Sequence, residues 1–368
     1  MSDAVITRPV RRRPTFHPLP VVGVDRLTGE AVMITFAVPP SLRALYAFTA
    51  GQHVTVRLPA DGADVRRSYS ICSTPAELAD TGQLRIGVKE VPGGAFSTFA
   101  VRALKTGDTV DVLPPMGHFG TAFAPDRVRR YAAVAAGSGI TPVLSIVATA
   151  LAVEPQSTVT LVYGNRNARS VMFAEELADL KDRHPTRLHL IHVLSREPGE
   201  SPLLSGRIDG ERMTRLIDAL LPPVAEVDEW FLCGPYAMVT QVRSVLQEHG
   251  AGVVHQELFF ADDAPPPANA PAGPAEIGAE ATIVLDGRSS TVTVAPGERV
   301  LDAALRVRPE LPFACKGGVC STCRAKLAEG EVAMARNYAL EPDEVAAGYV
   351  LTCQATPVTD RIVVDFDG

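Results

Sequence analysis

The sequence has few cysteines and no long apolar segment, and these absences limit the kinds of protein it can encode. Six cysteines in 368 residues are too few for a disulfide-stabilised scaffold. No apolar segment follows the arginines at residues 11–13, so this basic run is not the start of a signal peptide. The longest apolar stretch, residues 143–153, is too short to cross a bilayer and indicates a buried helix. We therefore expect a cytoplasmic protein that does not engage a membrane.

An excess of positive charge is missing as well. The formal net charge of −7 argues against a nucleic-acid-binding protein, because such proteins usually carry basic patches. The hydrophobic content of 46% and the charged content of 21% are ordinary for a soluble globular protein. A chain of 368 residues is long enough for two or three domains, each with its own core.

Three regions with different secondary-structure patterns follow a leader, residues 1–15, that we expect to be disordered. Residues 16–124 contain short strands separated by glycine and proline, which predicts an antiparallel β-barrel. Residues 125–262 alternate strands and helices, which predicts a doubly wound α/β domain with a parallel sheet. The prolines of residues 263–279 predict an extended linker. Residues 280–368 then contain a hairpin and a short helix before a cysteine-rich loop.

Four of the cysteines follow the spacing C-x4-C-x2-C, then 29 residues, then C. They are Cys315, Cys320, Cys323 and Cys353. This is the plant-type spacing of thiolates that hold a [2Fe–2S] cluster, and the glycines within residues 316–318 let the chain curl around one. A structural zinc site that makes the region a docking module is the alternative, although zinc modules usually carry two short knuckles.

Two short motifs in the barrel region predict a flavin site. We expect the side chains of Arg67, Tyr69 and Ser70 on one face of a strand. Arg67 can neutralise a phosphate there, Tyr69 can lie flat on an aromatic ring, and Ser70 can reach a ring nitrogen. Downstream, the glycine turn within residues 92–98 can present backbone N–H groups to a diphosphate at a helix start. A surface arginine beside a core tyrosine, and an ordinary turn, are the alternatives.

Two motifs in the α/β region predict a nucleotide site. Gly137 opens a G-x-G-I-T-P loop after a strand, with Thr141 as the expected helix N-cap and Pro142 as the first helical residue. The loop lacks the third glycine of the dinucleotide fingerprint, because Pro142 occupies that position. Cys233 and Gly234 end a later strand, where ligands bind in such sheets, and Cys233 could flank a nicotinamide. A plain turn and a buried structural thiol are the respective alternatives.

Side chains after the second and third parallel strands favour NADPH as the coenzyme. They are Arg166, Ser195, Arg196 and Arg207. Guanidinium groups can clamp a 2′-phosphate, whereas NAD sites prefer an acidic residue on the ribose. NADH is the alternative coenzyme, because each arginine could instead be a solvated surface charge.

Taken together and in this order, the motifs resemble two known families. Residues 16–262 resemble the ferredoxin–NADP reductase superfamily through R-x-Y-S, G-G-x-F-S, G-x-G-I-T-P, C-G-P and a terminal E-L-F. Residues 280–368 resemble plant-type ferredoxins through the cysteine spacing. The domain order resembles the reductase subunits of bacterial multicomponent oxygenases. Residues 66–72 and 337–353 are similar, more narrowly, to the reductase-subunit family of the phenylacetyl-CoA epoxidases. The reductases of Rieske-type steroid or aromatic hydroxylases share most of these features.

The resemblance implies a third fold, a set of cofactors and a set of site residues. The C-terminal domain would be an α+β β-grasp domain. Electrons would pass from NADPH through FAD and a [2Fe–2S] cluster to the separate oxygenase component of a multicomponent monooxygenase. A stand-alone flavin reductase with a docking module is the alternative. The implied FAD contacts are Arg67, Tyr69, Ser70, Lys89, Gly94, Phe96, Ser97 and Thr98. The implied NAD(P) contacts are Gly137, Thr141, Cys233 and Gly234, and the expected catalytic residues are Tyr69, Ser70, Cys233 and Phe259.

Overall fold

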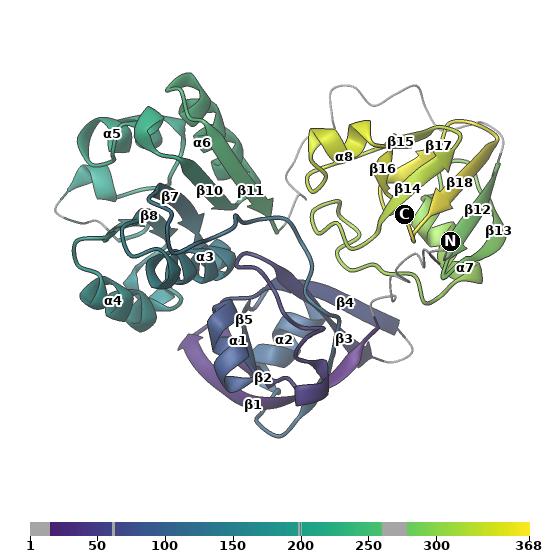
Figure 1. Cartoon of the computed structure of the whole chain (residues 1–368), viewed down its shortest axis with the longest axis horizontal. Coiled ribbons are helices and arrows are strands. Elements are labelled where there is room, and N and C mark those ends of the chain that lie inside the picture. Colours follow the sequence, from purple (N-terminus) through teal and green to yellow (C-terminus); the bar gives the residue numbers. More distant parts are fainter. Residues whose placement is uncertain (1–14, 61–62, 198, 200, 260–277) are drawn as a thin grey trace, which may run out of the picture. The chain divides into compact units, whose positions relative to one another are not determined.

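The computed structural model describes residues 15–60, 63–197, 199, 201–259 and 278–368, which fall into two compact units (Figure 1). The larger unit contains the barrel and α/β regions, and the smaller one contains the cysteine-rich region. The predicted leader, apart from Thr15, and nearly all of the predicted linker lie outside the described residues. Among the described helices, none combines the length and the apolar character that a membrane span requires.

The first part of the larger unit is a six-stranded antiparallel barrel. Its elements are β1 (His17–Thr28), β2 (Ala31–Ala37), β3 (His53–Ala60), β4 (Ala63–Ser70), α1 (Pro75–Thr81), β5 (Gln83–Lys89), α2 (Ala95–Arg102) and β6 (Thr109–Val112). The strand order is β4-β3-β6-β1-β2-β5, and a bridge between Ile71 and Ile86 closes the sheet by joining the end of β4 to β5. Alternate side chains such as Leu84, Ile86 and Val88 fill the interior.

The second part of the larger unit is a five-stranded parallel sheet with helices on both faces. Its elements are β7 (Arg130–Ala136), α3 (Ile140–Val153), β8 (Thr158–Asn165), α4 (Ala174–Arg183), β9 (Leu188–Leu194), α5 (Gly210–Ala219), β10 (Glu229–Gly234), α6 (Tyr236–Glu248) and β11 (Val253–Leu258). The strand order β11-β10-β7-β8-β9 reverses between β7 and β10. Helices α3 and α4 cover one face, and α5 and α6 cover the other. Ligands bind at the carboxyl ends of the strands beside such a reversal.

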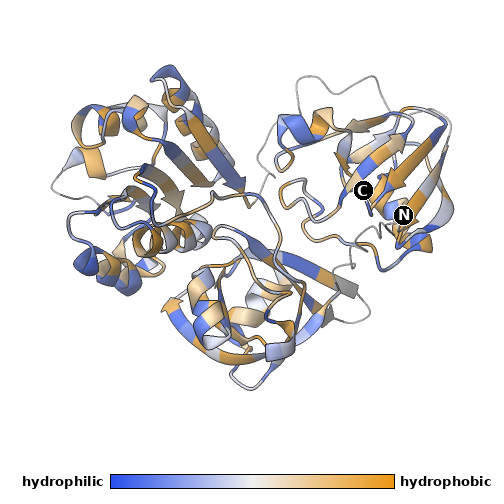
Figure 2. Cartoon of the chain, in the orientation of Figure 1, coloured by the Kyte–Doolittle hydropathy of each residue, from blue (hydrophilic) through white to orange (hydrophobic). Residues whose placement is uncertain are grey.

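Helix α3 begins earlier than the sequence predicts. Its N-cap is Gly139 and its first residue is Ile140, so the expectation that Thr141 caps the helix is wrong. A 3-10 turn over Gly137–Gly139 leads directly into the helix, and the Thr141 hydroxyl donates to the carbonyl of Ser138 at 3.0 Å. Pro142 is therefore the third helical residue and not the predicted first one, and it still lies in the first turn, where a missing N–H costs little. Nearly all of α3 is buried, and Figure 2 shows it mostly in hydrophobic colours.

Buried contacts join the barrel to the parallel sheet. The Arg85 guanidinium on β5 donates to the carboxylates of Glu77 on α1 and Glu176 on α4, at 2.6 and 2.9 Å. Gly87 on the same strand leaves room for Phe173, since a Cβ at Gly87 would lie 2.9 Å from the Phe173 ring. Phe173 itself is buried and has a positive φ of 58°. The barrel and the sheet therefore meet through fitted side chains.

The smaller unit is the β-grasp domain that the resemblance implies. Its elements are β12 (Ala279–Leu285), β13 (Arg288–Val294), α7 (Val300–Val307), β14 (Arg324–Glu329), β15 (Val332–Met334), α8 (Pro342–Ala346), β16 (Tyr349–Leu351), β17 (Ala355–Pro357) and β18 (Arg361–Asp365). The five-stranded sheet has the order β13-β12-β18-β14-β16, with β12 and β18 parallel, and α7 packs against it. Asp286 and Gly287 have the positive φ values that the predicted hairpin turn requires.

Candidate nucleotide, flavin and cluster sites

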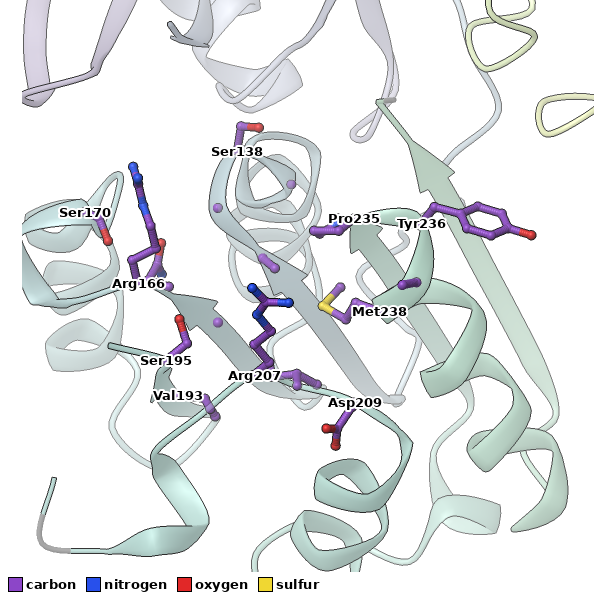
Figure 3. A pocket seen from close by; sticks show the side chains of 18 of the residues that line it. Ser138, Arg166, Ser170, Val193, Ser195, Arg207, Asp209, Pro235, Tyr236 and Met238 are labelled. Atoms are coloured by element: carbon purple, nitrogen blue, oxygen red, sulfur yellow. The ribbon is translucent and has the colours of Figure 1, made fainter. Parts of the chain in front are cut away.

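A pocket of about 1020 Å³ lies at the carboxyl ends of the parallel strands (Figure 3). Gly137 lines it after β7, Asn165 at the end of β8, Ser195 after β9 and Gly234 at the end of β10. These four positions surround the point where the strand order reverses. The volume is at the upper end of the usual range for small-molecule sites, which suits an extended ligand such as a dinucleotide.

Close packing accounts for the glycines of the predicted nucleotide loop. Gly137 has a φ of 55°, a value that favours glycine. A Cβ at Gly139 would lie 2.2 Å from the carbonyl oxygen of Cys233, so no larger residue fits there. Cys233 itself is fully buried, and burial followed by the Glu257 carboxylate raises the pKa of its thiol. Cys233 and Thr141 are buried beside the loop. Neither is among the described residues that line the pocket.

Three of the four side chains that favour NADPH line the pocket together. Figure 3 shows Arg166 and Ser195 on one side, with the Arg207 guanidinium lying between them and Met238. Arg166 also pairs with Glu30 of the barrel. Arg196 is exposed and is not among the lining residues in the described chain, so it contributes less directly than its position in the sequence predicts.

Lys89, implied as a flavin contact, lines the nucleotide pocket. Its Nζ lies 3.9 Å from where a Cβ on Gly137 would be. Burial, followed by the positive charge of Arg166, lowers the pKa of Lys89. An ammonium beside a glycine loop can bind a phosphate, and because its pKa is lowered this ammonium loses its charge at a lower pH than an exposed lysine does.

Sequence patterns missed several pocket residues. They include Asn165, Ser170, Asp209, Tyr236 and Met238. Asp209 caps α5 by accepting a hydrogen bond from the Arg212 N–H, and the Asp-Gly start could have marked that helix. Asn165 ends β8 and Tyr236 begins α6 just after the C-G-P motif, so their nearness to strand ends was the available signal.

The two flavin motifs come together in the barrel. Tyr69 on β4 packs against Phe96 on α2, with ring centroids 5.3 Å apart. Gly94 is the N-cap of α2, and a Cβ there would lie 2.4 Å from Ser97 Oγ. The exposed Arg67 guanidinium donates to the carbonyl of Arg66, which leaves further N–H groups for a phosphate. An aromatic side chain, a helix N-terminus and a cation therefore lie on neighbouring elements, as FAD binding requires.

Ser70 does not share a face with Tyr69, and that expectation is wrong. Successive residues of a strand point to opposite faces, and β4 extends through both positions. The Ser70 hydroxyl instead donates to Glu257 on β11 at 2.9 Å. With its hydrogen engaged in this way, Ser70 can offer only oxygen lone pairs to a ligand. Phe259, which follows β11, lines the nucleotide pocket.

The four predicted cluster ligands form two pairs in the smaller unit. A hydrogen bond from Cys320 lowers the pKa of Cys315 to about 6, and one from Cys323 lowers the pKa of Cys353. In the described part of the chain, no three His, Cys, Asp or Glu side chains are placed to hold a single metal ion. Two thiol pairs match the two irons of a [2Fe–2S] cluster, each of which is held by two thiolates.

Backbone and amide N–H groups surround this loop. Lys316, Gly318 and Ser321 all have positive φ values, which wind the chain around the thiols. The Gly317 N–H donates to Cys315 Sγ at 3.3 Å. The buried Gln354 amide donates to the Lys316 carbonyl at 2.8 Å and lies 3.6 Å from Cys353 Sγ. Such donors stabilise a negatively charged cluster, so these residues fit a [2Fe–2S] group.

Comparison with known protein families matches each of these regions. Residues 18–120 match the oxidoreductase FAD-binding domain, and residues 133–244 match the oxidoreductase NAD-binding domain. Residues 283–358 match the 2Fe-2S iron-sulfur cluster binding domain. The cofactors are therefore FAD, a nicotinamide nucleotide and a [2Fe–2S] cluster.

Similar proteins share this domain order along nearly the whole chain. One subunit of the 1,2-phenylacetyl-CoA epoxidase from Escherichia coli K12 is 46% identical over 96% of this chain and 98% of its own. The ferredoxin reductase component of 3-ketosteroid-9-alpha-monooxygenase from Rhodococcus rhodochrous is 34% identical over 95% of this chain and 96% of its own. The structure of phthalate dioxygenase reductase, at 22% identity, shares the fold with a TM-score of 0.56 over 95% of this chain and 98% of that one. The chain belongs to the family of oxidoreductases that serve as reductase components of multicomponent oxygenases.

Proposed function

We propose that this protein is the NADPH-dependent reductase component of a phenylacetyl-CoA epoxidase and that it works in the cytoplasm. The observation that carries the proposal is the 46% identity to a subunit of that enzyme over almost the full length of both chains. The steroid monooxygenase reductase is 34% identical over a similar length. The difference favours the epoxidase as the electron acceptor.

The proposed chemistry moves electrons from a two-electron donor to a one-electron acceptor. When bound, FAD would supply the conversion of a two-electron hydride into single electrons, and a [2Fe–2S] cluster would supply one-electron transfer to the oxygenase. The protein binds these groups and orients them. In this proposal the thiolates of the four cluster cysteines hold the irons, and the N–H of Gly317 and the amide of Gln354 offset their charge.

The nucleotide pocket supplies the groups that bind the coenzyme. The loop at Gly137 and the N-terminus of α3 would bind the diphosphate, assisted by the Lys89 ammonium. Arg166, Ser195 and Arg207 would bind the 2′-phosphate through charge-assisted hydrogen bonds. Among the described lining residues Asp209 is the only carboxylate, and it already accepts a hydrogen bond as the cap of α5. These features favour NADPH over NADH.

The flavin region supplies the groups that bind FAD. Arg67 would neutralise a phosphate, Tyr69 would lie against the ring system, and the N-terminus of α2 at Gly94 would bind the diphosphate. Ser97 and Thr98 remain proposed contacts of FAD, whereas Lys89, implied as a flavin contact, is proposed to bind the coenzyme diphosphate instead. Ser70, held by Glu257, would present its oxygen toward the flavin, and Phe259 would cover the ring.

Reconstitution tests the proposed acceptor and coenzyme together. The purified reductase is combined with the oxygenase of a phenylacetyl-CoA epoxidase or with that of a 3-ketosteroid monooxygenase, each supplied with its substrate. We expect NADPH-dependent product formation with the first oxygenase and little with the second, and a lower KM for NADPH than for NADH. Faster turnover with the steroid oxygenase would assign the protein to that partner instead.

A further inference from the structure

The hydroxyl of Tyr163 donates a hydrogen bond of 3.0 Å to the carbonyl oxygen of Gly137. Tyr163 belongs to no motif that marks the coenzyme site, whereas Gly137 is the first residue of the nucleotide loop. We propose that Tyr163 is a positioning residue that holds this loop in the shape that binds the diphosphate of the nicotinamide coenzyme. The inference rests on the proposed coenzyme site in the pocket.

Strand register brings the tyrosine to the loop. Strands β7 and β8 are parallel, and Tyr163 pairs with Ala135, two residues before Gly137. A side chain as long as tyrosine can therefore reach forward past the end of β7 to the next carbonyl. Tyr163 is fully buried, and burial raises the pKa of its hydroxyl. The proton therefore stays on the oxygen at neutral pH, where it is donated to Gly137.

The loop is then held on both sides. On the side of β10, Gly139 packs so closely on the Cys233 carbonyl that a Cβ would lie 2.2 Å from its oxygen. On the side of β8, the Tyr163 hydroxyl fixes the carbonyl of Gly137, a residue with a φ of 55°. The same carbonyl accepts the N–H of Ile140, the first residue of α3. Fixing it sets the orientation of the first turn of the helix, whose N–H groups face the strand ends.

A second polar side chain at the end of β8 lies beside Tyr163 and lines the pocket. Asn165 follows Tyr163 by two residues, so both side chains lie on the same face of the strand. Asn165 is 8% exposed and lines the pocket, and its Nδ2 makes no hydrogen bond of normal geometry within the described chain. Its amide lies close to the Tyr163 hydroxyl, and a hydrogen bond from Asn165 opposes the effect of burial on the pKa of that group. Asn165 therefore places a polar group at the pocket wall beside the tyrosine.

The competing explanation is that Tyr163 only fills the core and satisfies its own hydroxyl. Tyr131 on β7 provides a matched comparison, because it is also buried and its hydroxyl donates to the Glu154 carboxylate at 3.0 Å. It lies at the other end of the same sheet, near the start of β7, and it is not among the described lining residues of the pocket. Replacement of either tyrosine by phenylalanine removes the buried hydrogen bonds of its hydroxyl, and only the Tyr163 hydroxyl reaches the coenzyme loop.

The experiment compares Tyr163→Phe, Tyr131→Phe and Gly137→Ala in the full-length holoenzyme. FAD content and Tm are measured first, then the Kd for NADP⁺ by spectral titration of the flavin, then KM and kcat for NADPH and NADH with a soluble dye. We expect Tyr163→Phe to raise Kd and KM by about 2- to 10-fold, the net value of one hydrogen bond, with FAD content and kcat near wild type. Tyr131→Phe should lower Tm with unchanged coenzyme binding.

Gly137→Ala provides an independent check, because it strains the loop directly and leaves Tyr163 intact. It should raise the Kd for NADP⁺ as well. The variant that combines Tyr163→Phe with Gly137→Ala should show a smaller rise in Kd than the product of the two single-variant rises, since both substitutions act on one carbonyl. The inference would be overturned if Tyr163→Phe bound the coenzyme as tightly as wild type does. It would also be overturned if Tyr163→Phe and Tyr131→Phe weakened coenzyme binding equally. A wild-type protein that oxidises neither NADPH nor NADH would instead contradict the proposed function.

Discussion

Glu257 accepts a hydrogen bond of 2.9 Å from Ser70 Oγ across a sequence separation of 187 residues. Glu257 lies on β11, at the edge of the parallel sheet, and Ser70 ends β4 of the barrel. The Glu257 side chain is 12% exposed and its Oε1 lies 3.9 Å from His53 Nδ1. The contact joins the flavin strand to the last strand of the nucleotide domain, two residues before Phe259.

A double-mutant cycle measures this contact. Ser70→Ala, Glu257→Ala and the double variant should show a coupling free energy of about 1.5–3 kcal/mol in urea unfolding, as for hydrogen bonds to charged groups. The control is Ser68→Ala, which removes a longer, neutral contact of 3.4 Å to Thr55 on the adjacent strand and should cost less. Strictly additive losses for Ser70 and Glu257 would mean that the contact contributes nothing to holding the two domains.

The cluster ligands are tested by replacing cysteines one at a time. Serine at Cys315, Cys320, Cys323 or Cys353 should abolish the visible absorbance and the EPR signal of the cluster and leave FAD bound, because the two groups lie in separate units. Cys72→Ala is the control, since Cys72 is buried in the larger unit, where burial raises the pKa of its thiol. Loss of iron from Cys72→Ala would contradict the ligand assignment.

Coenzyme preference should depend more on Arg207 than on Arg196, because Arg207 lines the pocket and Arg196 does not do so in the described chain. Arg207→Ala should raise the KM for NADPH about tenfold or more and leave the KM for NADH nearly unchanged, since the guanidinium would bind the 2′-phosphate. Arg196→Ala should change both values little. Steady-state kinetics with a soluble dye measure all four values. Equal losses for the two coenzymes in Arg207→Ala would exclude 2′-phosphate recognition by this side chain.

The pH dependence of coenzyme binding should report on Lys89. Its pKa lies below the ordinary lysine value because of burial and Arg166, so the ammonium is lost at a lower pH than an exposed lysine would lose it. A phosphate binds the protonated form, so kcat/KM for NADPH should fall as pH rises through that pKa. Lys89→Arg keeps its charge throughout and should remove this alkaline decline. A decline of the same shape in both proteins would assign it to another group.

Regular patterns in the sequence predict much of the fold. The barrel strands are visible because apolar residues alternate, as in β5, and the parallel strands because β7 and β10 are almost continuously apolar. Strand β11 is missed because it is an edge strand with mixed burial and no alternation. Helix α1 could have been found, since Thr74 caps it, Pro75 starts it and Glu77 lies in its first turn.

The contacts within the site are harder to predict from the sequence than the fold is, because they join segments that are distant in the chain. Spacing identifies the cysteines and the glycine loop, and strand ends identify Arg166 and Ser195. The sequence carries no local signal that Glu257 meets Ser70 or that Tyr163 reaches Gly137, since strand order and register decide both. The position of Lys89 in the nucleotide pocket likewise depends on how the barrel packs against the sheet. Such residues become visible only in three dimensions.

The proposed electron path predicts that the two units have separable functions. All proposed flavin and nucleotide residues lie in the larger unit, and all four cysteines lie in the smaller one. A chain that ends at residue 261 should therefore fold, bind FAD and oxidise NADPH with a soluble dye. It should fail to support the oxygenase, because no one-electron carrier remains to reach the partner.

Coupled turnover with the oxygenase tests this path most directly. Product formation is measured with the full-length chain, with the chain ending at residue 261, and with full-length Cys353→Ser, which keeps the smaller unit but should lose the cluster. We predict product formation only with the wild-type full-length chain, while all three proteins reduce the dye at similar rates. Product formation by the shortened chain at the full-length rate would contradict the account, since electrons would then pass from FAD to the oxygenase directly.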